Sequence, residues 1–252
     1  MTRWQFQTRQ FLLPKSGHSL TECEDAIGID IDARSARFAV ADGATEAFAA
    51  RSWAEDLAHN WVQAEPAVLT SADFRVWIAE RGRWLHDSWK GLPFSWYSEE
   101  KASTGSFAAF VGVQFEVDSA VPSWRGIALG DSCLIHCRNN QVRQTLPRLN
   151  AASFNSMPCL VPSHCGLQEA ALERVSVDSG GIEPEDKFLL LSDAAAAWYL
   201  TLAEQEDPTR ICFDDLLAQG HEAELTQFFD SERASGRIKD DDIAIIGIEV
   251  RP

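Results

Sequence analysis

The sequence predicts an α+β fold in which two β-sheets form a sandwich flanked by helices. Short apolar runs typical of strands occur near both ends and in the middle of the 252-residue chain. The expected elements run strands, two helices, strands, helices, strand, and this order does not fit a regular βαβ alternation. Runs such as FLLL and IAIIGI are apolar on both faces, which is typical of a sheet buried between two layers.

The expected elements follow in order along the chain. Residues 3–13 alternate like a strand, and 26–31 with 37–41 form a hairpin. Apolar residues recur at helical spacing over 45–63 and 73–92. The remaining expected elements are strands at 104–117, 123–129, 131–137 and 141–146 forming an antiparallel meander, an irregular segment at 147–183, a strand at 186–193, helical structure over 194–232 and a strand at 243–250.

Composition and charge restrict the class of protein. The length and the 45% hydrophobic content suit a single domain spanning residues 1–252. No apolar run approaches the roughly 20 residues of a membrane span, and the N-terminus lacks the apolar core of a signal peptide, so we expect a cytoplasmic protein without a membrane partner. The formal charge of -16 repels nucleic acid, so a phosphate-bearing partner would need a local cation.

The six cysteines contain no C-x-x-C pair, and in a chain of this length they favour reduced, buried thiols over a disulfide scaffold. Cys133 and Cys137 are expected on the same face of one strand, with His136 facing the other way. This arrangement favours ordinary packing over a zinc site, which is the alternative.

Aspartates stand where the expected strands begin or end. If the first hairpin is centred on residues 33–34, Asp25 lies opposite Asp42 at its open end. Asp193 follows one later strand and 241–242 precede another, so both share an edge if these strands are antiparallel neighbours. Clustered carboxylates repel unless a cation lies between them, and oxygen ligands suit magnesium or manganese. The alternative for each aspartate alone is a turn or a helix cap.

Six short motifs occur in order along the chain: ECEDAIGID, FAVADGA, TGSFAAFVGV, IALGDSCLIH, DKFLLLSDA and DDDIAIIGIEV. Their order and intervals resemble the metal-dependent protein phosphatases of the 2C type over about residues 17–250, and the stretch from SGH to CEDA is most similar to a small bacterial branch. The resemblance implies a four-layer α-β-β-α sandwich with two mainly antiparallel central sheets. It also implies hydrolysis of phosphoserine and phosphothreonine through a binuclear Mg2+ or Mn2+ centre and metal-bound water, without a covalent enzyme intermediate.

The resemblance further implies a role for each matching residue. Asp42 would bridge both ions, and Gly43 would offer its carbonyl to one of them. Asp193 and Asp241 would bind the other ion. The remaining implied ligands are Glu24 and Asp25, which would act through bound water, and Asp131, which would help to hold a third, looser ion.

The phosphate-binding arginine that the family places four residues before Glu24 is Leu20 here, which leaves His18 or Lys15 as substitutes. We therefore count His18 with Asp42, Asp193 and Asp241 as the expected catalytic residues.

Three further departures concern the backbone. The glycine-rich continuation after Gly43 is Ala44-Thr45-Glu46, and the glycine that follows Asp193 in the family is Ala194. The usual Asp-Asn before the last strand is Asp-Asp at 241–242 with Asp240 adjacent, so the register of the ligand is open by one residue.

The expected function is a bacterial signalling phosphatase that acts as a monomer on a phosphorylated protein, alongside a cognate Ser/Thr kinase. The missing arginine and the altered glycines favour an alternative, a catalytically weak or inactive phosphatase-like module that binds and regulates a phosphorylated partner or kinase. A further alternative is a two-metal hydrolase of nucleotides. The sequence contains no G-x-S-x-G, P-loop or H-E-x-x-H motif, so other hydrolase chemistries have no anchor.

Overall fold

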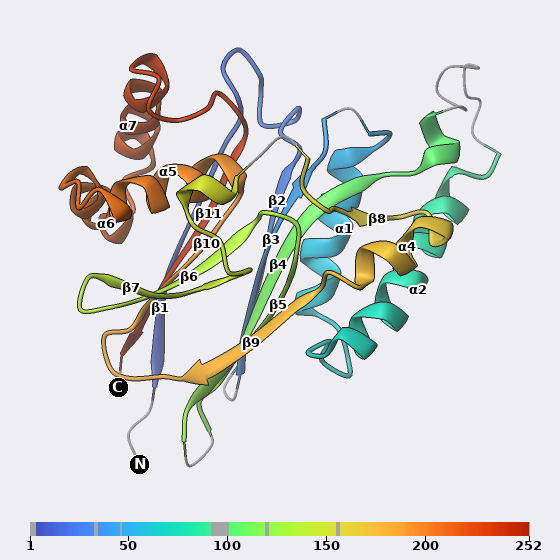
Figure 1. Cartoon of the computed structure of the whole chain (residues 1–252), viewed down its shortest axis with the longest axis horizontal. Coiled ribbons are helices and arrows are strands. Elements are labelled where there is room, and N and C mark those ends of the chain that lie inside the picture. The colour runs from blue at the N-terminus through green and yellow to red at the C-terminus, as the bar shows by residue number, and fades with distance from the viewer. Residues whose placement is uncertain are drawn as a thin grey trace.

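The computed structural model consists of two stacked β-sheets with helices on both outer faces (Figure 1). It describes residues 4–32, 35–45, 47–91, 101–118, 121–154 and 157–251. All strand pairings in both sheets are antiparallel. The first sheet has the order β1 (Gln5–Leu13), β11 (Ile243–Arg251), β10 (Lys187–Leu191), β6 (Cys133–Arg138) and β7 (Gln141–Leu146).

The second sheet contains the N-terminal hairpin. Its order is β2 (Asp25–Ile31), β3 (Ser35–Gly43), β4 (Phe107–Glu116), β5 (Ser123–Leu129) and β9 (Ser176–Gly181), and the short β8 (Val161–Pro162) also pairs with β4. Both termini of the described chain lie at the same end of the sandwich, at the bottom of Figure 1.

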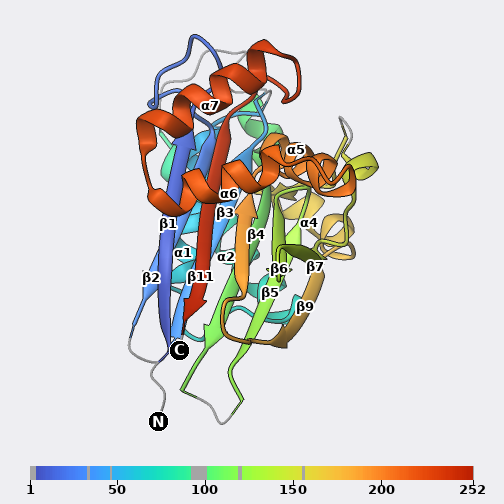
Figure 2. The same cartoon turned by 90° about the vertical axis from the view of Figure 1, so that its left-hand side faces the viewer.

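Helices cover the outer face of each sheet. The β2–β9 sheet packs against α1 (Ala50–Val62), α2 (Ser71–Trp89) and α4 (Cys165–Leu172) through one apolar cluster. The β1–β7 sheet packs against α5 (Asp193–Glu204), α6 (Thr209–Gln219) and α7 (Glu222–Ala234), and Figure 2 shows α6 and α7 crossing in front of β1 and β11. The predicted α-β-β-α sandwich is therefore confirmed.

A third apolar cluster fills the space between the two sheets. Phe38 and Phe115 from one sheet meet Phe188 from the other, and the rings of Phe115 and Phe188 lie 4.9 Å apart. Each such buried side chain contributes roughly 1.5–3 kcal/mol through the hydrophobic effect. Strands β3, β4, β10 and β11 contact an apolar cluster on each face, so each contains a run that is apolar on both faces, as predicted for FLLL and IAIIGI.

The two long predicted helices exist with shifted boundaries. The first was expected from residue 45 but begins at Ala50, because residues 47–49 form turns and Ala49 has a left-handed backbone with φ 52°. The second begins at Ser71, where Thr70 accepts a hydrogen bond from the Asp73 amide and donates one to the Asp73 carboxylate. Glu46 and Leu92 lie outside the described residues.

The prediction of an irregular segment at 147–183 is wrong. It contains a 3₁₀ turn (Ala151–Ser153), β8, α4 and β9. Strand β9 pairs with β5 along six residues, yet its sequence SVDSGG carries little apolar signal because it lies at the sheet edge with alternate residues exposed. Main-chain hydrogen bonds define this strand, and they leave no signature in composition.

The expected single meander over 104–146 is also wrong, because β4 and β5 belong to one sheet and β6 and β7 to the other. The chain crosses between sheets at Gly130, which has φ 109° and lies so close to Ala109 that a Cβ at position 130 would fall 2.6 Å from the Ala109 Cβ. The helical segment 194–232 is divided into three helices, and Gly220 ends α6 in the left-handed conformation with φ 72°.

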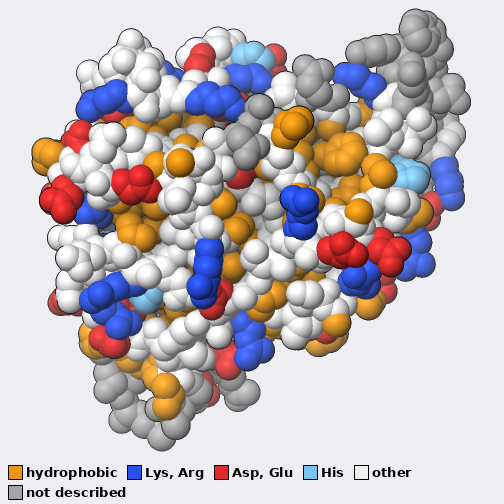
Figure 3. All heavy atoms as spheres, in the orientation of Figure 1, with side chains coloured by type: hydrophobic (Ala, Val, Ile, Leu, Met, Phe, Trp, Pro, Cys, Tyr) orange, Lys and Arg blue, Asp and Glu red, His pale blue; other side chains and the backbone are white. Residues whose placement is uncertain are grey.

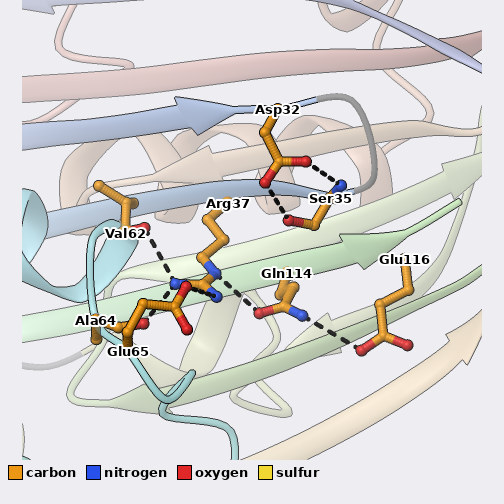
Figure 4. Close-up of polar contacts among 8 residues, drawn as sticks. All are labelled: Asp32, Ser35, Arg37, Val62, Ala64, Glu65, Gln114 and Glu116. Atoms are coloured by element: carbon orange, nitrogen blue, oxygen red, sulfur yellow. Dashed lines mark hydrogen bonds and ion pairs between the residues drawn. The ribbon is translucent and has the colours of Figure 1, made fainter. Parts of the chain in front are cut away.

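A buried arginine anchors α1 to its sheet (Figure 4). Arg37 on β3 donates to Gln114 on β4 at 3.0 Å and to the carbonyl oxygens of Val62 and Ala64 at the end of α1, at 3.3 and 2.6 Å. It also pairs with Glu65 at 3.1 Å. The cation thus satisfies carbonyl groups that a helix C-terminus leaves without partners.

The surface bears both signs of charge despite the negative total. On the face drawn in Figure 3, acidic and basic side chains are interspersed. Within the described part of the chain, no helix is long and apolar enough to cross a bilayer.

Candidate functional site

The first hairpin has the predicted register. Residues 33–34, its expected centre, lie outside the described residues, but the paired positions on either side place Asp25 directly opposite Asp42. Asp25 begins β2 and is 4% exposed, while Asp42 stands one residue before the end of β3 and is half-buried. One pair of carboxylates therefore marks the open end of this hairpin, at the upper edge in Figure 1.

A second pair comes from the other sheet, as expected for antiparallel neighbours. Strands β10 and β11 pair with Leu191 opposite Ile245, so Asp193 after β10 and Asp241 before β11 share an edge. The two carboxylates meet at the ammonium of Lys239, whose Nζ lies 3.5 Å from Asp193 Oδ2 and 2.5 Å from Asp241 Oδ2.

The carboxylates of the two sheets act on one another electrostatically. Burial raises the pKa of Asp25 well above its usual value, against a hydrogen bond with Ser192, and Asp242, Asp193 and Asp241 raise it further. Burial also raises the pKa of Asp42, with added repulsion from Asp25 and Asp193. The order of causes shows that desolvation dominates and that like charge adds to it.

Asp131 joins the same edge from the crossing between β5 and β6. It is 8% exposed, and burial followed by repulsion from Asp193 raises its pKa to about 6. All the aspartates proposed from the motifs thus lie at one end of the sandwich, where their charges are incompletely compensated.

The donor atoms at this edge suit a hard cation. Within the described part of the chain, Asp25 Oδ2 and Glu24 Oε2 are buried without a hydrogen-bond partner, although Glu24 Oε2 lies 3.8 Å from Lys15 Nζ. Buried oxygens without partners are costly, and a divalent ion with oxygen preference would remove that cost. Among the described residues, no three His, Cys, Asp or Glu side chains already stand together as a ligand set. The chemistry of the donors therefore fits magnesium or manganese, and their side chains would adjust to hold it.

Gly43 is required for close packing. A Cβ at this position would fall 2.8 Å from the Ala50 carbonyl group and 2.9 Å from the Glu24 carbonyl oxygen, and the Gly43 amide donates to the same Glu24 oxygen. The start of α1 and the loop residue before β2, Glu24, thus approach Gly43 without room for a side chain. The glycine has a steric reason that is independent of any ion.

The three consecutive aspartates at 240–242 have separate partners. Asp242, 5% exposed, accepts from the backbone amides of Lys15 and Glu24, each at 2.8 Å. Asp240 accepts from the Ser16 amide at 2.9 Å. Asp242 and Asp240 therefore hold the loop before β2 in place, and Asp241 is the member of the run that faces Asp193.

Ser192 is a site residue that the sequence analysis missed. It is fully buried, accepts from the Ala244 amide at 2.9 Å and hydrogen-bonds with the Asp25 carboxylate. It thereby connects the first sheet to an aspartate of the second. Its position directly before Asp193 was the only available sequence signal.

Alanine at position 194 is compatible with the backbone of the site. Ala194 lies in the first turn of α5, where alanine is well suited, so this position does not need glycine.

Leu20 is 55% exposed, His18 is exposed, and Lys15 is half-buried beside Glu24. His18 lowers the pKa of Asp240, after the larger effects of the Ser16 hydrogen bond and Arg233.

The cysteines of β6 share one face of the strand, as their spacing predicted, and helices cover this face. Cys133 and Cys137 are buried, and Cys137 Sγ lies 3.6 Å from the Tyr199 hydroxyl. Burial raises the pKa of the Cys137 thiol to about 11. His136 faces the other way, where it stacks on Phe188 with ring centroids 4.4 Å apart. These contacts are those of a packed core.

Comparison with solved structures identifies the fold. The photosystem II phosphatase PBCP matches with a TM-score of 0.60 and 15% identity over 97% of this chain and 98% of that chain. The catalytic domain of the serine/threonine phosphatase PstP, solved with two manganese ions, matches with a TM-score of 0.58 and 13% identity over 99% and 100%. PppA, a regulatory component of T6SS in Pseudomonas aeruginosa, gives 0.56 and 16% over 98% and 97%.

No protein-family model matches the chain, and no curated protein matches it significantly. At these low identities the solved structures establish the fold, which is the fold that the six motifs predicted.

Proposed function

We propose that this chain is a metal-dependent phosphatase that hydrolyses phosphoserine and phosphothreonine in proteins, with two Mg2+ or Mn2+ ions and a third held more loosely. One observation carries the proposal: buried carboxylates from both sheets converge at one edge, where Asp25 Oδ2 has no hydrogen-bond partner among the residues that the structure describes. The fold shared with PBCP and PstP supports it. When bound, the ions would supply positive charge that holds the phosphate and acidifies water.

The residues have distinct parts in this proposal. Asp42 and the Gly43 carbonyl would hold one ion, with Asp42 shared between both, and Asp193 and Asp241 would hold the other. Glu24, Asp25 and Asp131 would complete the acidic surroundings, and His18 is kept as a contact for the phosphate. Ser192 orients Asp25 through its hydroxyl, and Asp242 fixes the loop that carries Glu24. The chain thus positions its ligands through residues of both sheets.

The biological setting belongs to the same proposal. The substrate would be a phosphorylated protein supplied by a cognate Ser/Thr kinase, and the chain would act in the cytoplasm as a monomer formed by a single domain over residues 1–252.

The proposal is tested by hydrolysis of p-nitrophenyl phosphate and of a phosphothreonine peptide with and without Mn2+. We expect manganese-dependent turnover that is lost in Asp42→Asn and Asp193→Asn and kept in Asp30→Asn. Asp30 is a matched control because it lies on the same β2–β3 hairpin, opposite Arg37 and far along the strand from Asp25. Absence of turnover with every divalent ion contradicts the proposal, and faster turnover of nucleotides than of the peptide replaces it with a nucleotide hydrolase.

A second candidate is a non-catalytic module that binds a phosphorylated partner or kinase. The exposed Leu20, at the position where the family carries its phosphate-binding arginine, favours it. Calorimetry separates the two functions, because the module would bind a phosphopeptide without turnover.

A further inference from the structure

We propose that Lys239 is a built-in cation of the Asp193–Asp241 carboxylate pair, and that a divalent ion reaches this position only by displacing the lysine. The displacement half of the inference rests on the proposed metal centre. The other half, that the ammonium holds the two carboxylates together without metal, rests on contacts within this chain alone.

The contacts place one ammonium between two carboxylates from separate elements. Lys239 Nζ lies 2.5 Å from Asp241, which precedes β11, and 3.5 Å from Asp193, which begins α5. Both aspartate side chains are about a quarter exposed, at 24% and 26%, whereas the lysine side chain is 65% exposed. The ammonium therefore enters from solvent and can leave without any rearrangement of the core.

The turn that carries Lys239 is held in place. The Asp241 amide donates to the Lys239 carbonyl oxygen at 3.0 Å, and Arg233 donates to the Asp241 carbonyl at 2.6 Å and to the Pro14 carbonyl at 3.0 Å. Because the backbone is fixed by these bonds, displacement of the lysine requires rotation of its side chain alone. The cation is thus both ordered and removable.

The two halves of the acidic edge differ in this respect. Among the residues that the structure describes, no lysine or arginine pairs with Asp42, whereas Asp193 and Asp241 share Lys239. Because a divalent ion must displace the ammonium, the apparent affinity for the ion falls as the fraction of molecules with the ammonium in place rises. The two ion positions are consequently unequal, and the position at Asp193 and Asp241 fills second.

The first test is Mn2+ binding by calorimetry to the wild type, Lys239→Met and the control Lys90→Met. Lys90 is a suitable control because it is an exposed lysine paired with a single aspartate, Asp87, at 2.6 Å on α2. An exposed ion pair is weak, so removal of the one that competes with the ion changes the affinity for Mn2+ by about 5-fold. We expect the weaker Mn2+ step to tighten by about that factor in Lys239→Met and to stay unchanged in Lys90→Met.

The second test is thermal unfolding in EDTA, which needs neither metal nor activity. We expect Lys239→Met to lower the melting temperature by about 1–4 °C relative to Lys90→Met, because Asp193 and Asp241 then repel without a counter-ion. Addition of Mn2+ should remove this difference.

The two tests separate failure of the inference from failure of the proposed function. Equal Mn2+ affinities and equal melting in EDTA across the three proteins overturn the inference and leave the metal centre standing. Absence of Mn2+ binding in all three overturns the proposed metal centre and the displacement, and melting in EDTA then decides whether Lys239 neutralises the pair.

Discussion

An aspartate lies next to each end of strand β10, and the charges that surround the two aspartates are opposite in sign. Before the strand, Asp186 is fully buried and accepts hydrogen bonds from Arg138 at 2.6 and 2.8 Å and from the Glu183 amide at 2.9 Å. His136 Nε2 lies 3.2 Å from the same carboxylate. After the strand, Asp193 joins an edge with several other carboxylates and one exposed lysine.

The difference appears in the pKa values of two equally buried acids. Burial alone would raise the pKa of Asp186, but hydrogen bonds from Arg138 and Glu183 lower it. At the other end burial raises the pKa of Asp25, and its acidic neighbours add to the rise. Burial is therefore not what distinguishes these groups. At one end opposite charges compensate one another and stabilise the fold, whereas at the other end like charges add to the cost of burial.

The largest effect is expected at Asp186, where the buried charge is compensated. Asp186→Asn removes the buried one of the two acidic partners of Arg138, leaving only Glu183, and breaking a buried charge pair costs about 3 kcal/mol. In a chain of this size the melting temperature should fall by about 6–12 °C, as measured by circular dichroism. The control is Asp178→Asn, since Asp178 pairs at 3.5 Å with an arginine whose side chain is 86% exposed, and it should change little. A fall of similar size in both variants contradicts the contrast.

Lowering the pH should remove the stabilisation that the ionised Asp186 carboxylate provides. Because the folded-state pKa of Asp186 lies below its ordinary value, the stabilisation is fully present above about pH 4 and is lost as pH falls through the lowered value. The difference in unfolding free energy between wild type and Asp186→Asn should stay large at pH 5 and shrink below pH 4. His136 titrates in contact with this carboxylate: burial lowers the pKa of His136 and Asp186 opposes that shift, so protonation of His136 below 6.5 destabilises both proteins and Asp186→Asn the more. A difference that does not narrow on acidification contradicts the linkage.

A smaller effect is expected where Arg37 joins α1 to its sheet. Arg37→Met leaves the Val62 and Ala64 carbonyl oxygens and Gln114 without this donor, which costs about 2 kcal/mol. Arg9→Met is the matched control, because Arg9 also donates to carbonyl oxygens, those of Thr8 and Ala218, but from a position that is only half-buried. Urea denaturation measures both. Mn2+ affinity should be the same in the two variants, and a selective loss of it in Arg37→Met would place this arginine in the site.

At the acidic edge, removal of a charge should stabilise the protein without metal. In EDTA at pH 8 we expect Asp25→Asn to raise the free energy of unfolding by about 1 kcal/mol, because a buried carboxylate that repels its neighbours becomes a neutral amide. The same variant should lose the stabilisation that Mn2+ gives the wild type. Asp30→Asn on the same strand should keep it. A destabilised Asp25→Asn in EDTA would show that the carboxylate already has a sufficient partner.

The sequence was informative where a local pattern determines geometry. The register that brings Asp25 opposite Asp42 follows from a tight hairpin, and the common edge of Asp193 and Asp241 follows from antiparallel neighbours. Both relations depend only on strand periodicity and direction. The apolar strands likewise indicated buried sheets, because two covered faces require two apolar faces.

The sequence was uninformative where tertiary contacts decide. Strand β9 is defined by main-chain pairing, and the sheet crossing at Gly130 depends on contact with Ala109. The partners of Asp242 and Ser192 are remote in sequence, more than 200 residues away in the first case and about 50 in its bond to Ala244. No local pattern encodes such pairings. For the same reason the sequence did not indicate that Lys239 contacts Asp193 as well as its near neighbour Asp241.

The smallest expected effect concerns the basic residues near Leu20. Lys15 and His18 lie in the loop between β1 and β2. Lys15 is half-buried beside Glu24, whereas His18 is exposed. Exposed charges contribute up to about 1 kcal/mol, so His18→Gln should raise the KM for a phosphopeptide by about 2–5-fold with little change in kcat. If Lys15 replaces the missing arginine instead, Lys15→Met raises KM more than His18→Gln does. Equal KM values in the wild type and both variants would mean that the acidic edge holds phosphate through its ions alone, which would sharpen its contrast with the arginine-compensated end at Asp186.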